Sequence, residues 1–211
     1  MNNLNAISLR NIEINSCGPF VHSHYQVDGL TVSQEGPLAG RADFLVNSAL
    51  NALSILQIKH DGQILDIGSY DGWILNQLYS RGGFVNLTGV EPRSTNIDRG
   101  YYLRNLLNIE DPARHLCGTL DEVEILQLSN RFDFVTCFGV VHHLNDLLDF
   151  LSKIALTLST NGYLLLECLT LSDDLVTPEI QSAIEPKDII YEDKQLETSI
   201  AKVTLLYSLN N

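Results

Sequence analysis

Short apolar runs alternate with longer amphipathic segments from residue 64 onward. The runs have the continuity of buried strands, and the segments between them carry apolar residues at helical spacing. This pattern predicts strands at 64–67, 84–90, 115–117, 132–137 and 163–168, and helices at 38–58, 73–80, 94–107, 121–128 and 145–158. Strands that alternate with helices predict an α/β fold with a parallel sheet and right-handed crossovers.

Glycine and polar residues mark the ends of these elements. Gly82-Gly83 stands where a helix C-terminus prefers glycine. Ser94 and Asn145 are placed to cap the helices that begin there. Asn161-Gly162 predicts a turn before the last strand of the series.

The two ends of the chain follow a different pattern. Residues 1–37 are rich in Asn, Ser and Gly and predict an N-terminal extension with short strands at 12–14 and 20–25. Residues 38–211 have the length of one domain with a full core. After residue 168 the chain is acidic, with one clear strand predicted at 203–207 and a weaker one at 188–191.

Composition and charge narrow the class of protein. The apolar fraction of 45% is that of a globular chain. Acidic residues outnumber basic ones 26 to 13, and the net charge of −13 repels nucleic-acid phosphate and anionic membranes. Nucleic acid is therefore an unexpected partner, unless another protein supplies a basic surface. The start of the chain lacks the pattern of a signal peptide, and a cytoplasmic protein is expected. None of the four cysteines forms a CxxC pair, so no metal site is expected.

The stretch Ile64–Gly72 reads as strand, glycine turn and helix start. Such a turn presents backbone N–H groups to a ligand at the carboxyl end of a strand. It lacks the G-x-G-x-x-G spacing that brings a helix to a pyrophosphate, so a nicotinamide cofactor is disfavoured. S-adenosylmethionine, which has no phosphate, fits better. Asp66 can pair with its ammonium, Gly68 allows close approach, and Glu91 can accept its ribose hydroxyls.

Four segments resemble, in order, the motifs of class I S-adenosylmethionine-dependent methyltransferases: ILDIGSYDG, GVEP, FDFVTCFGVVHHLND and NGYLLLECL. The resemblance covers about residues 45–170. It implies a Rossmann-like open, mostly parallel sheet with helices on both faces, and S-adenosylmethionine as the cofactor. Members usually close the sheet with two further strands, the last antiparallel. The short tail of this chain therefore implies either a compact closing hairpin or a shortened C-terminal end.

One residue of the turn departs from the family pattern, because Tyr70 stands where the usual turn has a central glycine. An aromatic residue there is reminiscent of a subgroup similar to the tRNA wobble-uridine carboxymethyl-transferring enzymes. This leaves open whether the donor is ordinary or carboxylated S-adenosylmethionine.

The resemblance also implies the residues that line the cofactor site. They are Asp66, Gly68, Ser69, Tyr70, Gly72, Glu91, Pro92, Thr119, Leu120, Phe138 and Gly139. The first five would surround the methionine end, Glu91 the ribose, and Thr119 and Leu120 the adenine. Phe138 and Gly139 would face the sulfonium.

Two groups of residues are candidates for contact with the acceptor. His142 or His143 could take a proton from it, or could instead support the helix that follows. Adjacent histidines are expected to point in different directions and so not to form a metal pair. His22, His24 and Tyr25 could contact the acceptor if the N-terminal extension covers the pocket, or could belong to a surface strand.

The leading functional hypothesis is methyl transfer to a small or medium acceptor. Oxygen is slightly favoured as the acceptor atom, because no Asn/Asp-Pro-Pro-Tyr signature of N-methylation follows the strand at 132–137. The alternatives are a binding or scaffold protein that has kept the fold without catalysis, and a tRNA-modifying transferase. The acceptor and the oligomeric state stay open.

Overall fold

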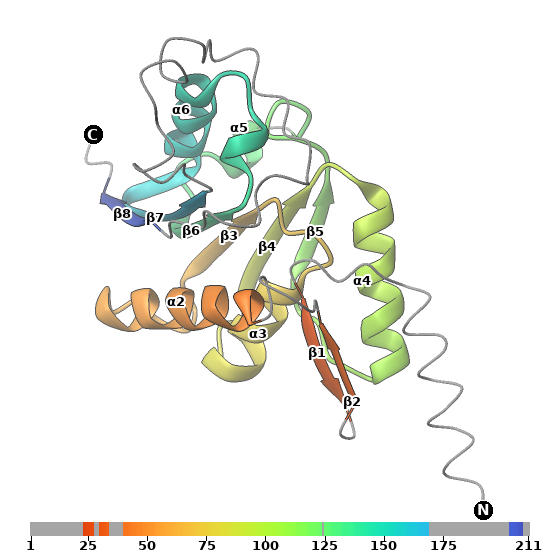
Figure 1. Ribbon diagram of the computed structural model, residues 1–211. Coiled ribbons are helices and arrows are strands. Elements are labelled where there is room, and N and C mark those ends of the chain that lie inside the picture. Colours follow the sequence, from red (N-terminus) through yellow and green to blue (C-terminus); the bar gives the residue numbers. More distant parts are fainter. Residues whose placement is uncertain (1–22, 28–29, 34–39, 124, 169–202, 209–211) are drawn as a thin grey trace, which may run out of the picture.

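The computed structural model describes residues 23–27, 30–33, 40–123, 125–168 and 203–208. A six-stranded sheet in the order β5-β4-β3-β6-β7-β8 forms its centre (Figure 1). The strands are β3 (Gln63–Ile67), β4 (Asn86–Glu91), β5 (Arg114–Cys117), β6 (Phe132–Phe138), β7 (Leu158–Cys168) and β8 (Val203–Ser208). All neighbours are parallel except β8, which runs antiparallel to β7. The predicted mostly parallel sheet is confirmed, and β8 is the predicted strand of the tail.

Helices cover both faces of the sheet. They are α2 (Arg41–Ile55), α3 (Trp73–Gly82), α4 (Ser94–Leu107), α5 (Ile125–Leu128) and α6 (Leu147–Thr157), with a 3₁₀ turn η2 (Val141–His143) before α6. One core cluster joins α2, α3 and α4 to the sheet, and a second cluster includes residues of α5 and α6. The predicted strands at 12–14 and 188–191 lie outside the described residues.

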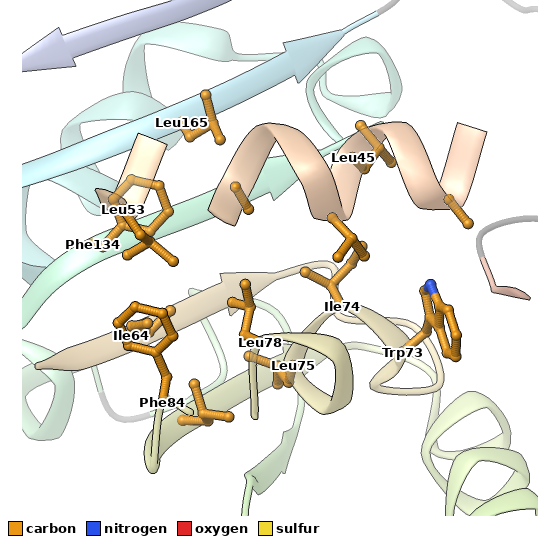
Figure 2. Packing of buried hydrophobic residues seen from close by; sticks show 14 of the residues in the cluster. Leu45, Leu53, Ile64, Trp73, Ile74, Leu75, Leu78, Phe84, Phe134 and Leu165 are labelled. Carbon is orange, nitrogen blue, oxygen red and sulfur yellow. The ribbon is translucent and has the colours of Figure 1, made fainter. Parts of the chain in front are cut away.

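The two cores follow from the alternation of side chains along each strand. Ile64 of β3 faces α2 and α3, and its neighbour Leu65 belongs to the second cluster. Figure 2 shows the first cluster, in which side chains of α2 and α3 pack together beside Ile64 and Phe134 of the sheet. Asp66 has the same parity as Ile64, so the acid at the end of β3 lies on the α2 and α3 side.

A hairpin of β1 (His24–Val27) and β2 (Leu30–Ser33) forms a separate antiparallel pair. Tyr25 is 1% exposed and belongs to the first core cluster. Its ring meets that of Trp73 edge-on, with centroids 4.8 Å apart. Tyr25 is therefore a core residue that fastens the hairpin to α3, and the alternative of an ordinary surface strand is wrong at this position.

Helix caps differ from the prediction at two places. Ser94 is the first residue of α4, and Arg93 in extended conformation occupies the cap position. Asp146, not Asn145, caps α6, where its Oδ1 accepts the N–H of Asp149 at 2.9 Å. A carboxylate at this position also interacts favourably with the helix dipole, which explains the preference.

Two element boundaries also differ. The helix predicted at 121–128 is reduced to α5, its last turn, because the chain first makes a tight turn in which Thr119 N–H donates to Glu122 Oε2 at 2.8 Å. The turn predicted at Asn161-Gly162 is wrong, since β7 runs through both residues. The extra length is taken up by a shift in register with β6, between the pairs Phe132–Leu158 and Phe134–Tyr163.

Candidate functional site

Three buried acids end three strands on the same side of the sheet. Asp66, Glu91 and Glu167 stand at the carboxyl ends of β3, β4 and β7, and are between 2% and 5% exposed. The strand order reverses at β3, because β4 and β5 lie on one side of β3 and β6 and β7 lie on the other. Ligands of open α/β sheets bind in the crevice at such a switch point.

The turn between β3 and α3 has a left-handed backbone at three positions. The φ angles are +74° at Gly68, +54° at Tyr70 and +81° at Gly72. The N–H groups of Gly68 and Ser69 donate to Val90 O at 2.8 and 3.1 Å, which fastens the turn to β4. A Cβ atom at Gly68 would lie 2.4 Å from Val140 Cγ2, so no side chain fits there.

Tyr70 keeps the backbone that a central glycine would adopt. Its left-handed φ is unusual for a residue with a side chain. The ring packs under the Arg99 guanidinium, 4.3 Å from its centroid. Tyr70 thus takes a left-handed backbone position that glycine adopts more readily, and its ring lies against Arg99.

The surroundings of Asp66 raise the pKa of its carboxyl group toward neutral pH. Its Oδ1 accepts a hydrogen bond from Thr136 Oγ1 of β6 at 2.7 Å. Burial raises the pKa of Asp66 to about 7, Glu91 adds to the rise, and the bond from Thr136 opposes it. A buried carboxyl in this state gains from a cationic partner, which would favour its ionised form.

Glu91 is bonded by its own chain on both oxygens. Oε2 accepts the N–H of Tyr70 at 3.0 Å. Oε1 accepts the N–H of Arg93 at 3.1 Å and Nδ2 of Asn96 at 2.9 Å. A carboxylate offers roughly four acceptor positions. A ribose diol at Glu91 would therefore use the remaining position and share or displace the Tyr70 N–H.

A pocket opens beside the turn. It is lined by Leu45, Asp66, Gly68, Ser69, Tyr70, Asp71, Trp73, Ile74 and Phe138. Five of these nine residues are ones that the sequence predicted to bind a cofactor. Within the described part of the chain, the buried Ser69 Oγ has no hydrogen-bond partner. The pocket thus joins an acid and a spare hydroxyl to apolar walls from α2, α3 and β6.

The loop after β5 lies beside the end of β4, where Gly118 N–H donates to Glu91 O at 3.0 Å. Thr119 is exposed, but the side chain of Leu120 is 4% exposed and packs in the second core cluster. Leu120 can therefore meet a ligand only through its backbone. Pro92 directly follows Glu91 and is exposed.

The two histidines after β6 lie against each other. Their ring centroids are 4.1 Å apart, so the expectation that they point in different directions is wrong. The tight 3₁₀ turn η2 brings the two side chains to the same side. Burial lowers the pKa of His142, and His143 and Arg41 lower it further against the opposing charge of Glu167. His143 is exposed.

The N-terminal candidates divide into separate environments. His24 Nδ1 lies 2.7 Å from Asp43 Oδ2 of α2, and its ring stacks near Trp73 with centroids 6.4 Å apart. Tyr25 packs in the core. His22 lies outside the described residues. Neither His24 nor Tyr25 lines the pocket beside the turn.

Sequence reasoning missed a buried ion pair beside this pocket. Arg41 Nη2 lies 2.7 Å from Glu167 Oε2, and the two side chains are 9% and 4% exposed. A Cβ atom at Gly139 would stand 3.0 Å from the same Arg41 nitrogen. The partners are 126 positions apart in the chain, so no local pattern could have joined them.

Comparison with known proteins identifies the family. The family model of a methyltransferase domain matches residues 39–198. The chain belongs to this family. Membership confirms the predicted class I fold and the predicted enzyme class, the S-adenosylmethionine-dependent methyltransferases.

Individual relatives of this methyltransferase domain are distant. The tRNA U34 carboxymethyltransferase of Mannheimia succiniciproducens is 29% identical over 156 residues, covering 74% of this chain and 45% of that protein. The protein of the same name from Haemophilus influenzae (strain ATCC 51907) is 28% identical over 159 residues, covering 75% and 46%. The chain thus spans about half the length of the curated relatives it matches.

Solved structures share the fold of the methyltransferase domain. A putative sarcosine dimethylglycine methyltransferase from Galdieria sulphuraria matches with a TM-score of 0.54 at 20% identity, covering 67% of this chain and 50% of that one. Phosphoethanolamine N-methyltransferase 2 of Haemonchus contortus, in complex with S-adenosylmethionine, matches with a TM-score of 0.52 at 21% identity, covering 64% and 31%. Across the described ranges, no helix has the length and apolar character to cross a membrane.

Proposed function

We propose that this domain binds S-adenosylmethionine at the turn after β3 and transfers its methyl group to a small or medium acceptor. The observation that carries the proposal is Asp66, a buried carboxyl with a pKa of about 7 that lines the pocket. A nearby cation would stabilise the ionised form of this carboxyl, and the ammonium group of the ligand supplies such a cation. The Ser69 hydroxyl beside it, which has no hydrogen-bond partner among the described residues, fits a second polar contact to the amino-acid end.

The remaining residues take roles by their position around this anchor. Glu91 accepts a ribose hydroxyl, and the exposed loop of Thr119, next to Glu91, flanks the adenine with Pro92. Phe138 ends β6 and Gly139 directly follows it, and both face the sulfonium, where apolar walls exclude water. When bound, S-adenosylmethionine supplies a methyl group on a positively charged sulfur. The chain contributes alignment of acceptor, methyl and sulfur, which is the main source of acceleration in such a transfer.

His142 is the proposed general base for an acceptor that must lose a proton. Its lowered pKa keeps the imidazole neutral at pH 7, which is the form that accepts a proton. The exposed His143 packs on it and supports its orientation. His22 and His24 belong to the N-terminal extension, residues 1–37, which is proposed to cover the acceptor side, with Tyr25 as its anchor on Trp73.

A small acceptor is favoured over tRNA by the net charge of −13, which repels nucleic-acid phosphate. The tRNA-modifying alternative is favoured by the names of the curated relatives. The two alternatives also differ in donor, since a carboxymethyl group would come from carboxylated S-adenosylmethionine. Oxygen stays the proposed acceptor atom.

Calorimetric titration tests the cofactor. Wild-type protein is expected to bind S-adenosylmethionine and not NADH. Asp66→Ala and Glu91→Ala should each weaken binding by about 1–3 kcal/mol, because each removes charge-assisted hydrogen bonds. Asp133→Ala is the matched control, an acid at the opposite end of β6 that accepts the Gln63 N–H at 2.9 Å. Its affinity should equal that of the wild type, and an equal loss in all three variants would contradict the assignment.

The acceptor is tested by transfer of a labelled group. The protein is incubated with S-adenosylmethionine or with carboxylated S-adenosylmethionine, each labelled in the group that is transferred. The acceptor is either a panel of small hydroxylated metabolites or unmodified tRNA. Label in a small molecule supports the proposal. Label in tRNA, or reaction only with the carboxylated donor, overturns the small-acceptor reading. Cofactor binding without transfer to any acceptor favours the scaffold alternative.

A further inference from the structure

A buried charged cluster lies under the glycine turn and is not part of the pocket wall except at Asp71. It consists of Asp71 in the turn, Arg104 of α4, Asp111 after α4 and His115 of β5. The side chains of Arg104, Asp111 and His115 are 3%, 10% and 1% exposed, and Asp71 is 1% exposed. Four ionisable groups are thus withdrawn from water directly behind the proposed cofactor site.

Arg104 is the centre of this cluster. Its Nη1 donates a hydrogen bond to the carbonyl oxygen of Asp71. Its Nε lies 2.7 Å from Asp111 Oδ2, and His115 Nε2 lies 2.8 Å from the same oxygen. Burial alone would raise the pKa of Asp111, but the bond from His115 and the charge of Arg104 outweigh it and lower the pKa. Asp111 therefore stays ionised and holds the guanidinium in place.

Two glycines leave the space that Arg104 needs. A Cβ atom at Gly100 would lie 2.1 Å from Asp71 O and 2.8 Å from Arg104 Nη1. A Cβ atom at Gly72 would lie 2.6 Å from His115 Cε1 and 3.0 Å from Arg104 Nη1. The backbone on both sides is therefore fitted to the guanidinium, and any side chain at either glycine would push the turn away from α4.

The other side of Asp71 is fastened as well. Its Oδ1 accepts the N–H of Trp73 at 3.1 Å, at the start of α3. Its Oδ2 accepts the hydroxyl of Ser23, next to β1, at 2.5 Å. The Asp71 side chain thus connects the turn to α3 and to the N-terminal hairpin. Arg104 holds the same residue by a hydrogen bond to the backbone carbonyl oxygen of Asp71.

We propose that Arg104 is the positioning residue of the cofactor turn: it fixes the course of residues 68–72 from behind, through Asp71, without touching the ligand. A fully charged fork that is buried costs desolvation free energy, and well-packed apolar residues would often stabilise the fold as well or better. The guanidinium of Arg104 instead fixes the relative position of two groups, because it contacts the Asp71 carbonyl and the Asp111 carboxylate at the same time. The inference deepens the proposed function and rests on it for the identity of the ligand.

Two variants test this role. Arg104→Met removes the fork, and Gly100→Ala leaves every polar group in place but forces the turn off the helix. Both are expected to bind S-adenosylmethionine at least 10-fold more weakly than the wild type. Arg104→Lys, which keeps the charge but cannot reach both partners, should fall between them and the wild type. The second readout is the fluorescence of Trp73, the single tryptophan of the chain, which should shift in emission without any ligand.

Ile154→Ala is the control for general loss of stability. Ile154 is fully buried in the second core cluster, on the opposite face of the sheet. This variant should unfold more easily and yet keep wild-type affinity and wild-type Trp73 emission. Wild-type affinity and emission in both Gly100→Ala and Arg104→Met would overturn the proposal. A wild type that binds no S-adenosylmethionine would instead refute the proposed function, while the Trp73 signal would still decide the role of Arg104.

Discussion

Arg41→Met is expected to lower the free energy of unfolding by about 3–5 kcal/mol, the usual cost of leaving a buried charge without its partner. The ion pair with Glu167 is almost fully withdrawn from water, with side chains 9% and 4% exposed and 2.7 Å between nitrogen and oxygen. It connects the first residue of α2 to the end of β7, next to Gly139. Urea denaturation followed by circular dichroism measures the loss.

Two further variants separate the ion pair from the loss of a long side chain. The Arg81 side chain is 41% exposed, and its Nη1 lies 4.0 Å from Asp43 Oδ1. Arg81→Met should therefore lower the free energy of unfolding by less than about 1 kcal/mol. The double variant Arg41→Met, Glu167→Leu should recover most of the stability, because apolar residues can replace a buried pair at little cost. If Arg41→Met proved no more harmful than Arg81→Met, the pair would not stabilise the end of β7.

Periodicity was sufficient to predict the central sheet. Mostly apolar runs such as Phe132–Cys137, in which only Asp133 is not fully buried, lie between the two helical layers, so local composition is enough to identify them as strands. The C-terminus of α3 followed from Gly83, which adopts the left-handed conformation that glycine favours there. The register shift in β7 could not be predicted in this way. Asn161-Gly162 is a good turn sequence, and only pairing with β6 keeps it in the strand.

The residues of the candidate site also fall into those that local sequence predicts and those that depend on distant partners. Asp66, Gly68 and Glu91 could be proposed from the sequence because their expected roles depend on position after a strand, which the sequence displays. Arg41, Glu167 and Arg104 were missed because each acts through a partner distant in the chain. Arg104 is 33 residues from Asp71, and both look like solvated charges on their own segments. Burial of a charge is a property of the assembled layers, and no spacing rule within one element reports it.

Asp66→Asn is expected to stabilise the ligand-free protein at pH 8 by up to about 4 kcal/mol, the equivalent of a pKa raised from 3.8 to about 7. At any pH between these two pKa values, Asp66 is mostly protonated in the folded state and mostly ionised in the unfolded state. Wild-type stability therefore falls as the pH rises from about 4 to about 7. Asparagine cannot ionise, and it can still accept the hydrogen bond from Thr136. The gain should be present in urea denaturation at pH 8 and absent at pH 4.

The same variant should lose the pH dependence of cofactor binding. Binding of the ligand ammonium requires ionised Asp66, so below pH 7 each bound ligand must first displace a proton. Wild-type affinity should then fall about 10-fold for each pH unit from 7 to 5, a window below the titration of an α-amino group at about 7.7–8.0. Asp66→Asn should bind weakly with an almost constant affinity over this window, as measured by calorimetry. A wild-type affinity that does not change between pH 7 and pH 5 would mean that Asp66 does not face the ammonium. Together with the gain in stability at pH 8, a loss of affinity would show that the carboxyl is retained for the ligand at the expense of the fold.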